Sequence, residues 1–289
     1  MNMKSVKFFL IALVATLIAA PFTSMAQVFS KKEDLKDLNG KTLMVVLENN
    51  SIIDLTLKQS VEKEWDLSKV EFCDPDKFEK IKTDSSYYFL IRVKGIFKKE
   101  REPSIEFLSL LKGGEEAYMG LDEMYDVLSL PFQQTDDPDG YIVPYIDAYI
   151  NIIKSHVLRV QKKKIAATLG LSWYSNRLQE LKDKEVLVNE ADLSGIVSKE
   201  EAGKMLKKSG KVVEEDVIYE AIDNKKANTA YTICIGPEVE KQGSYCYKMV
   251  VSADSHDIYY YRKQKVNVKN PKGFLPEDLK KIAIPNSIF

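Results

Sequence analysis

The sequence is poor in the residues that most often build metal sites and nucleophilic sites. It has two histidines, His156 and His256, and three cysteines in 289 residues. Neither an HExxH motif nor a paired CxxC spacing is present, so His156 is expected on a helix surface and His256 in a turn. The GxSxG and GxxxxGK[ST] motifs are also absent, which makes Gly113-Gly114 a simple turn. We therefore predict no catalytic, cofactor-binding or metal-binding residues.

An excess of positive charge is also lacking. The chain has 42 Lys and Arg against 43 Asp and Glu, a formal net charge of −1. Nucleic-acid binders gain most of their affinity by neutralising phosphates, so this balance argues against a nucleic-acid partner.

The amino-terminal segment has the pattern of a secretory signal peptide. Lys4 and Lys7 precede the apolar run Phe8–Ala20, and Ser24-Met25-Ala26 supplies small residues for cleavage after Ala26. The run is shorter than the ~20 residues that a transmembrane helix needs. No cysteine follows the cleavage point to carry a lipid. We expect export to the periplasm or the cell surface, without a membrane span.

The strongest periodic pattern lies at the centre of the chain. From Tyr141 to Lys164, apolar residues recur every three or four positions, which predicts an amphipathic helix with one buried face. Thr135–Gly140 before it is expected to be a loop, and Ser172–Lys184 after it a second, shorter helix.

The segments on either side of the central helix follow one order of elements. Before it we predict strand 41–47, helix 52–65, strand 70–73, a helix from Asp74, strands 86–97 and 104–111, and strand 124–132 stopped by Pro131. After it we predict strand 185–188, helix 198–208, strand 212–213, helix 215–222, strands 230–235, 245–252 and 257–263, and a helix begun by Pro276.

This repeated order predicts the fold. We expect an α+β protein (α/β units) made of two related mixed-sheet units, each with helices on one face, joined by the long central helix. The predicted divisions are 1–26 (signal peptide), 27–135 (first unit), 136–184 (helical connector) and 185–289 (second unit).

Two resemblances accompany this pattern. Residues 41–111 are similar in element order to the amino-terminal α/β domain of periplasmic TolB-like proteins. The combination of Trp65, Val70-Glu-Phe, Ser86-Tyr-Tyr-Phe-Leu and a Lys-Gly-Gly turn resembles uncharacterised secreted proteins of Bacteroides-type bacteria. The second resemblance implies an envelope location, and neither implies an activity.

Cys234 and Cys246 lie in successive predicted strands. Pairing about residue 240 would place them opposite each other, where a disulfide could form in an oxidising compartment, or both could stay thiols. Cys73 would be left free and buried.

Consecutive tyrosines form the candidate binding surface. Neighbouring strand residues alternate between faces, so some of Tyr87-Tyr88 and Tyr259-Tyr260-Tyr261 would face solvent if the sheet had a wet face. Tyr88 and Tyr260 are the candidates for stacking on a sugar or contacting a protein. The alternative is that helices cover that face and the rings are part of the core.

Together these patterns favour an exported, non-enzymatic binding or scaffold protein of the bacterial cell envelope that acts through an unknown protein partner. The alternatives are a hydrolase-type enzyme with a site between the halves and a glycan-binding module using exposed tyrosines. A pocket between the halves holding two carboxylates, one with a raised pKa, would favour the enzyme.

Overall fold

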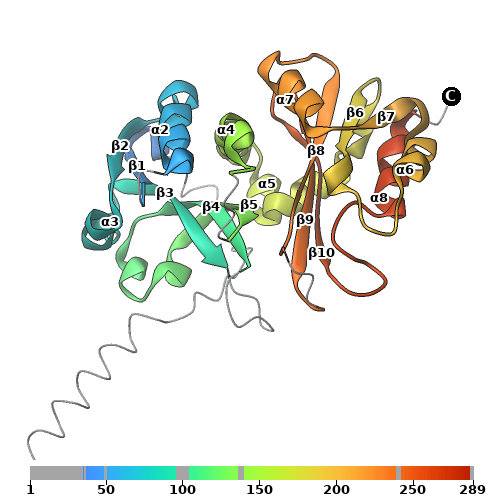
Figure 1. Ribbon diagram of the computed structural model, residues 1–289. Coiled ribbons are helices and arrows are strands. Elements are labelled where there is room, and N and C mark those ends of the chain that lie inside the picture. Colours follow the sequence, from blue (N-terminus) through green and yellow to red (C-terminus); the bar gives the residue numbers. More distant parts are fainter. Residues whose placement is uncertain are drawn as a thin grey trace, which may run out of the picture.

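The computed structural model describes residues 35, 37–48, 51–95, 104–135, 140–238 and 242–286. The predicted signal peptide and residues 136–139 of the predicted loop lie outside these ranges. The described chain forms two units side by side, each built on a five-stranded sheet (Figure 1). Across the described ranges, no helix is both long and apolar enough to cross a membrane.

The first unit has a mixed sheet with strand order β2-β1-β3-β4-β5. Strand β1 is parallel to β2 and β3, while β4 and β5 continue the sheet in antiparallel fashion. Its elements are β1 (Thr42–Val46), α2 (Ile52–Glu64), β2 (Lys69–Cys73), α3 (Pro75–Ile81), β3 (Tyr87–Gly95), β4 (Ile105–Lys112), β5 (Tyr125–Gln134) and α4 (Ile146–Lys162).

The second unit repeats this topology. Its sheet order, β7-β6-β8-β9-β10, has the same parallel and antiparallel pairs at equivalent places. Its elements are β6 (Glu185–Asn189), α6 (Lys199–Leu206), β7 (Gly210–Val213), α7 (Glu215–Asp223), β8 (Thr229–Ile235), β9 (Tyr245–Ser252), β10 (Ile258–Lys265) and α8 (Pro276–Ala283). The prediction of two related mixed-sheet units is confirmed.

Local signals explain why the helices begin where the sequence predicted. The Ser51 hydroxyl accepts a hydrogen bond from the Asp54 N–H at the start of α2, and Ser198 with Glu201 forms a capping box at the start of α6. Such caps satisfy N–H groups that have no partner inside the helix. Because they depend only on neighbouring residues, they can be read from the sequence.

The helices lie on both faces of each sheet, so the expectation of one covered face is wrong. In the first unit, Leu57 of α2 packs with Leu43 on one face, whereas Phe78 of α3 meets Phe89 edge-on at 5.0 Å on the other. The chain crosses from β1 to β2 and then back over β1 to β3. Crossovers between parallel strands are almost always right-handed, so two crossovers that run in opposite directions place their helices on opposite faces.

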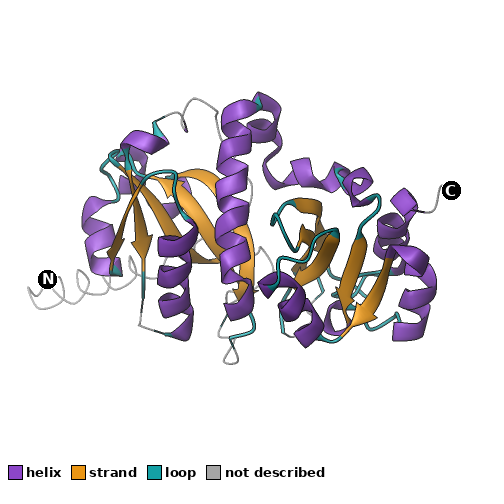
Figure 2. Cartoon of the chain, turned by 90° about the horizontal axis from the view of Figure 1, so that it is seen from above, coloured by secondary structure: helices purple, strands orange, loops and turns teal. Residues whose placement is uncertain are grey.

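Helix α4 lies between the two units (Figure 2). Toward the first unit, the Tyr149 hydroxyl donates to the Pro131 carbonyl at 2.7 Å. Toward the second unit, Tyr145, just before α4, meets Tyr219 edge-on at 5.5 Å and lies tilted against Tyr231 at 5.9 Å between ring centres. One continuous apolar core therefore includes both sheets and α4.

Three local predictions are corrected. Strand β5 runs through Pro131 to Gln134, because β5 is an edge strand where a missing N–H costs no ladder bond. The segment 172–184 forms short 3₁₀ helices instead of an α-helix. His156 is fully buried, because α4 is covered on two sides, and its Nδ1 is 3.0 Å from the Tyr174 hydroxyl. Burial lowers the pKa of His156 to about 4.

Candidate functional site

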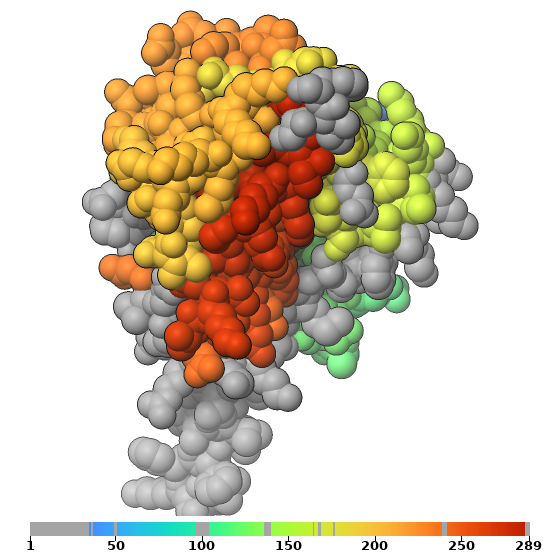
Figure 3. All heavy atoms as spheres, turned by 90° about the vertical axis from the view of Figure 1, so that its right-hand side faces the viewer, coloured from blue at the N-terminus to red at the C-terminus, as the bar shows by residue number. Residues whose placement is uncertain are grey.

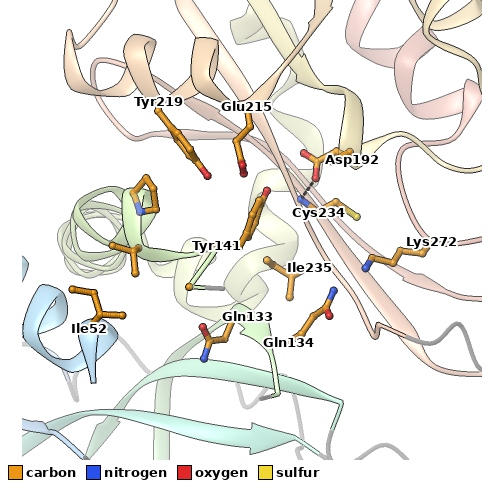
Figure 4. A pocket seen from close by; sticks show the side chains of 14 residues that line it. Ile52, Gln133, Gln134, Tyr141, Asp192, Glu215, Tyr219, Cys234, Ile235 and Lys272 are labelled. Carbon is orange, nitrogen blue, oxygen red and sulfur yellow. Dashed lines mark hydrogen bonds between the residues drawn. The ribbon is translucent and has the colours of Figure 1, made fainter. Parts of the chain in front are cut away.

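A pocket of about 680 Å³ lies between the two units. This volume falls in the range of ~300–1,000 Å³ that is typical of small-molecule sites. Its lining combines the carboxyl ends of β5 and β8 and the turn after β6 with residues of α2 and α7 and the segments that precede α4 and α8 (Figure 4). The lining residues are Ile52, Gln133, Gln134, Gly140, Tyr141, Val143, Pro144, Ala191, Asp192, Glu215, Tyr219, Cys234, Ile235 and Lys272.

Asp192 is the most deeply buried charged group of the pocket, with only 4% of its surface exposed. It follows β6 in a short 3₁₀ turn, which the side chain of Asn189 caps. Its carboxylate accepts hydrogen bonds from the Thr232 hydroxyl at 2.7 Å and from the Cys234 N–H at 3.1 Å. Both partners belong to β8, so the neighbouring parallel strand fixes the orientation of this carboxylate.

Burial raises the pKa of Asp192 to about 7. The hydrogen bonds from Thr232 and Cys234 stabilise the charged form, but they only partly offset the lost hydration. Near neutral pH, this side chain therefore exchanges between a neutral acid and a carboxylate.

A second segment, just before α8, brings Lys272 to the same place. The Phe274 N–H donates to the Asp192 carbonyl at 2.8 Å, and the Ser194 N–H donates to the Phe274 carbonyl at 3.2 Å. Gly273, between Lys272 and Phe274 in the sequence, has φ +102°, and a Cβ there would lie 2.6 Å from the Ser194 nitrogen. Only glycine fits this close crossing, which fixes Lys272 beside Asp192.

Helix α7 supplies the second acidic group. Glu215 is its first residue, where the positive end of the helix dipole favours a negative charge. Tyr219 lies one turn further along the helix, and Tyr141 reaches the pocket from the segment before α4. In Figure 4, Tyr141, Glu215 and Tyr219 lie together, whereas Lys272 lies beyond Cys234.

The first unit contributes Gln133, which is 5% exposed and lines the pocket. Its Nε2 donates to the Glu106 carboxylate at 2.7 Å. Glu106 belongs to a buried cluster in which Arg92 also contacts Glu48 and Asp54, at N–O distances of 3.1–3.4 Å. Burial raises the pKa of Glu106, and Arg92 opposes that shift. Through the hydrogen bond from Gln133 to Glu106, this cluster fixes the orientation of the Gln133 side chain.

The tyrosines expected to face solvent are buried. Tyr88 is 0% exposed and donates to Asp37 at 2.8 Å, and Tyr260 is 3% exposed and donates to Asp278 at 2.5 Å. Helices cover both faces of each sheet, so the wet face on which the expectation rested does not exist. Tyr88 and Tyr260 are core residues and do not form a binding surface.

The two cysteines of the second unit lie on neighbouring strands but not opposite each other. Cys234 pairs with Lys248, and Cys246 lies across from Gly236, so the predicted register is shifted by two residues. Their side chains still interact: the Cys234 thiol stabilises the Cys246 thiolate and lowers the pKa of Cys246 to about 7. All three cysteines are buried thiols here, Cys73 as expected. The disulfide itself stays a prediction.

No family model, curated protein or solved structure matches the chain. The resemblances to TolB-like domains and to secreted Bacteroides-type proteins therefore stay predictions. The assignment of the candidate site therefore depends on the geometry of this structure alone.

The sequence reasoning missed Asp192, Glu215, Lys272 and Gln133, which lie in four separate segments. One signal was available: ligands in open α/β sheets bind outside the carboxyl ends of the parallel strands. Asp192 is the third residue after such a strand, β6. Nothing in the sequence, however, indicated which helix starts and strand ends would meet between the units.

The described residues contain no cluster of His, Cys, Asp and Glu that could hold a metal ion.

Proposed function

We propose that this chain is an exported binding protein whose ligand is a small polar molecule held between the two units. The observation that carries the proposal is the pocket itself, lined from both units and containing the buried carboxylate of Asp192. A buried ionisable group costs stability unless it is fully paired, so its presence in a pocket supports a ligand-binding role.

Blocking the pocket tests this proposal. Ala191 is exposed and lines the pocket, so Ala191→Trp should fill it without disturbing the core. Ala227→Trp, at an exposed position that does not line the pocket, is the matched control. The three proteins are screened by thermal shift against a panel of polar small molecules. Any hit is confirmed by calorimetry.

The expected result is a ligand that stabilises the wild type and Ala227→Trp but not Ala191→Trp. Equal stabilisation of all three proteins, or no stabilisation of the wild type by any member of the panel, would overturn the proposal.

One observation favours an enzyme as the second candidate. Asp192, with a pKa of about 7, shares the pocket with Glu215, and a pair of carboxyl groups in one pocket can act as an acid and a base. Under this reading, the wild type hydrolyses a member of a panel of chromogenic glycosides and esters, and Asp192→Asn abolishes the turnover. Absence of turnover with every member would count against it.

Export is the remaining part of the proposal. The segment ending in Ser24-Met25-Ala26 supports it, and amino-terminal sequencing of the protein from the envelope fraction should give Gln27 as the first residue. Retention of residues 1–26 in the mature protein would contradict it.

A protein partner in the envelope stays a separate prediction, to be tested by a pull-down with the whole mature chain.

A further inference from the structure

The buried polar atoms that line the pocket and lack a hydrogen-bond partner are of one kind. Among the described residues they are Gln133 Oε1 and Glu215 Oε1, and both are acceptors. The amide of Gln133 cannot be reversed to offer a donor instead, because its Nε2 already donates to the carboxylate of Glu106, which only accepts. A ligand that satisfies these atoms must bring N–H or O–H donors.

The formal charges around the pocket indicate that the donor group of the ligand is positively charged. Glu215 and Asp192 line it directly. Lys272 adds one positive charge to the lining. Behind Gln133, Arg92 contacts Glu48, Asp54 and Glu106, and Lys94 also acts on Glu106, so five acidic side chains stand against three basic ones. A positive ligand group is attracted by this surplus of acidic groups, and desolvation in the pocket strengthens the attraction.

Aromatic rings complete the surroundings on the Glu215 side. Tyr141 and Tyr219 line the pocket, and Tyr145 connects them, with ring-centre distances of 5.5 Å to each. The faces of tyrosine rings attract cations, and their edges and apolar surface accept the carbon part of an amine.

From these observations we propose that the pocket binds an organic ammonium ion. Its ammonium group donates to Glu215 and to the ionised form of Asp192, and its carbon part lies against Tyr141 and Tyr219. Gln133 lies across the pocket from Glu215, where it can accept from a second donor of the ligand. This inference rests on the proposed function, since it names the ligand class of the same pocket. Lys272 is the positively charged residue of the lining, and Cys234 lies between it and Glu215 (Figure 4). Because Lys272 would repel a cation, we place the ammonium group on the side of the pocket formed by α7.

Three probes of similar size and different charge test the ligand class. They are 2-phenylethylammonium, 2-phenylethanol and phenylacetate, titrated by calorimetry into the whole protein at about pH 8, where Asp192 is mostly ionised. The expected order of affinity is ammonium first, the alcohol at least about tenfold weaker, and the carboxylate weakest. Equal or tighter binding of the alcohol or the carboxylate, or no binding of the ammonium probe, would overturn the inference.

Two neighbouring substitutions separate the site from general charge effects. Glu215→Gln removes the carboxylate in the pocket and should weaken the ammonium probe about tenfold or more while leaving the alcohol unchanged. Glu214→Gln removes the same charge one residue earlier, at an exposed position, and should change neither affinity by more than about twofold. Equal losses in both variants would contradict a direct contact with Glu215.

The outcomes also separate this inference from the proposed function. Ligands blocked by Ala191→Trp but lacking an ammonium group would leave the binding role intact and refute the ligand class. An ammonium probe that binds wild type and Ala191→Trp equally would refute both.

Discussion

Helices α4 and α8 are the last helices of the two units and occupy equivalent places. The ion pairs that their aspartates form, however, differ strongly in exposure. In the first unit, Asp147 of α4 accepts from Ser60 and from Lys63 of α2, and the Lys63 side chain is 61% exposed. In the second unit, Asp278 of α8 bonds Lys248, and both side chains are 0% exposed. One topology thus supports a partly hydrated ion pair in one copy and a buried one in the other.

The difference follows from what covers each helix. Each terminal helix packs beside the helix that follows the first strand of its unit, as α8 and α6 do in Figure 3. The second unit packs against α4, so α4 is apolar on two sides and its acidic group stays near solvent with α2. Among the described elements, α8 has its main contacts with α6 and short 3₁₀ segments and none of comparable size with the first unit, and its first turn points Asp278 into its own sheet, toward Tyr260 and Arg262.

Breaking the buried pair should have the largest effect on stability. Asp278→Asn would leave the Lys248 ammonium buried without a counter-charge, and we expect a loss of about 3–5 kcal/mol in the free energy of unfolding. Asp147→Asn, the equivalent change in the first unit, should cost at most ~1 kcal/mol. Urea denaturation of both variants measures the difference. Similar losses would show that the two units hold their last helices by the same energetics.

The glycines that precede the terminal helices offer a second comparison. Gly273, before α8, has φ +102°, and a Cβ there would lie 2.6 Å from the backbone nitrogen of Ser194. Gly140, before α4, has φ +65°, and a Cβ there would lie 3.4 Å from the nearest side chain. We expect Gly273→Ala to cost about 2–3 kcal/mol and Gly140→Ala about 1 kcal/mol, because both strain φ but only the first also forces a clash. Thermal unfolding tests this order. Gly195→Ala, with open space around it, is the control and should change little.

Each unit also contains one aspartate with a pKa near neutrality: burial raises those of Asp126 and of Asp192 to about 7. In the unfolded chain such groups lose their proton near pH 4, so between about pH 4 and 7 the folded state binds more protons than the unfolded state. Each group therefore makes stability fall as pH rises through this window, by up to ~1.4 kcal/mol per pH unit.

Replacing each aspartate by asparagine should remove its own share of this slope. Asp126→Asn and Asp192→Asn are compared by urea denaturation at several pH values, and only the second should also weaken ammonium binding, because Asp126 does not line the pocket. A slope in Asp192→Asn equal to that of the wild type would contradict the raised pKa of Asp192. The groups that act on Asp192 or are acted on by it are Thr232, Cys234, Glu215, Lys272, Tyr141, Tyr145 and Tyr149.

The smallest expected effect concerns Lys272. If the pocket binds an ammonium ion, Lys272→Gln should tighten binding of 2-phenylethylammonium by about two- to fivefold, because it removes a repulsive charge. Lys269→Gln, at an exposed position nearby, should leave the affinity unchanged. Weaker binding in Lys272→Gln would mean that the ligand also presents an acceptor to this side chain.

Where most of the helices and strands begin could be predicted from the sequence, because these features depend on near neighbours. The Ser198–Glu201 capping box and Pro75 at the start of α3 both act within one turn. The repeated order of elements also predicted two related units, since each hydrophobic pattern specifies its own kind of element.

Only the tertiary structure decided which surfaces meet. Opposite-face crossovers buried Tyr88 and Tyr260, and the 3₁₀ segment Gly170–Asn176 brought Tyr174 against the buried His156. Strands β8 and β9 paired two residues away from the expected register of Cys234 and Cys246. The pocket belongs to the same class: Asp192, Glu215, Gln133 and Lys272 have no sequence relation and converge only because two sheets pack around one helix. Local patterns determine the elements of this protein, whereas contacts between residues distant in sequence determine its site.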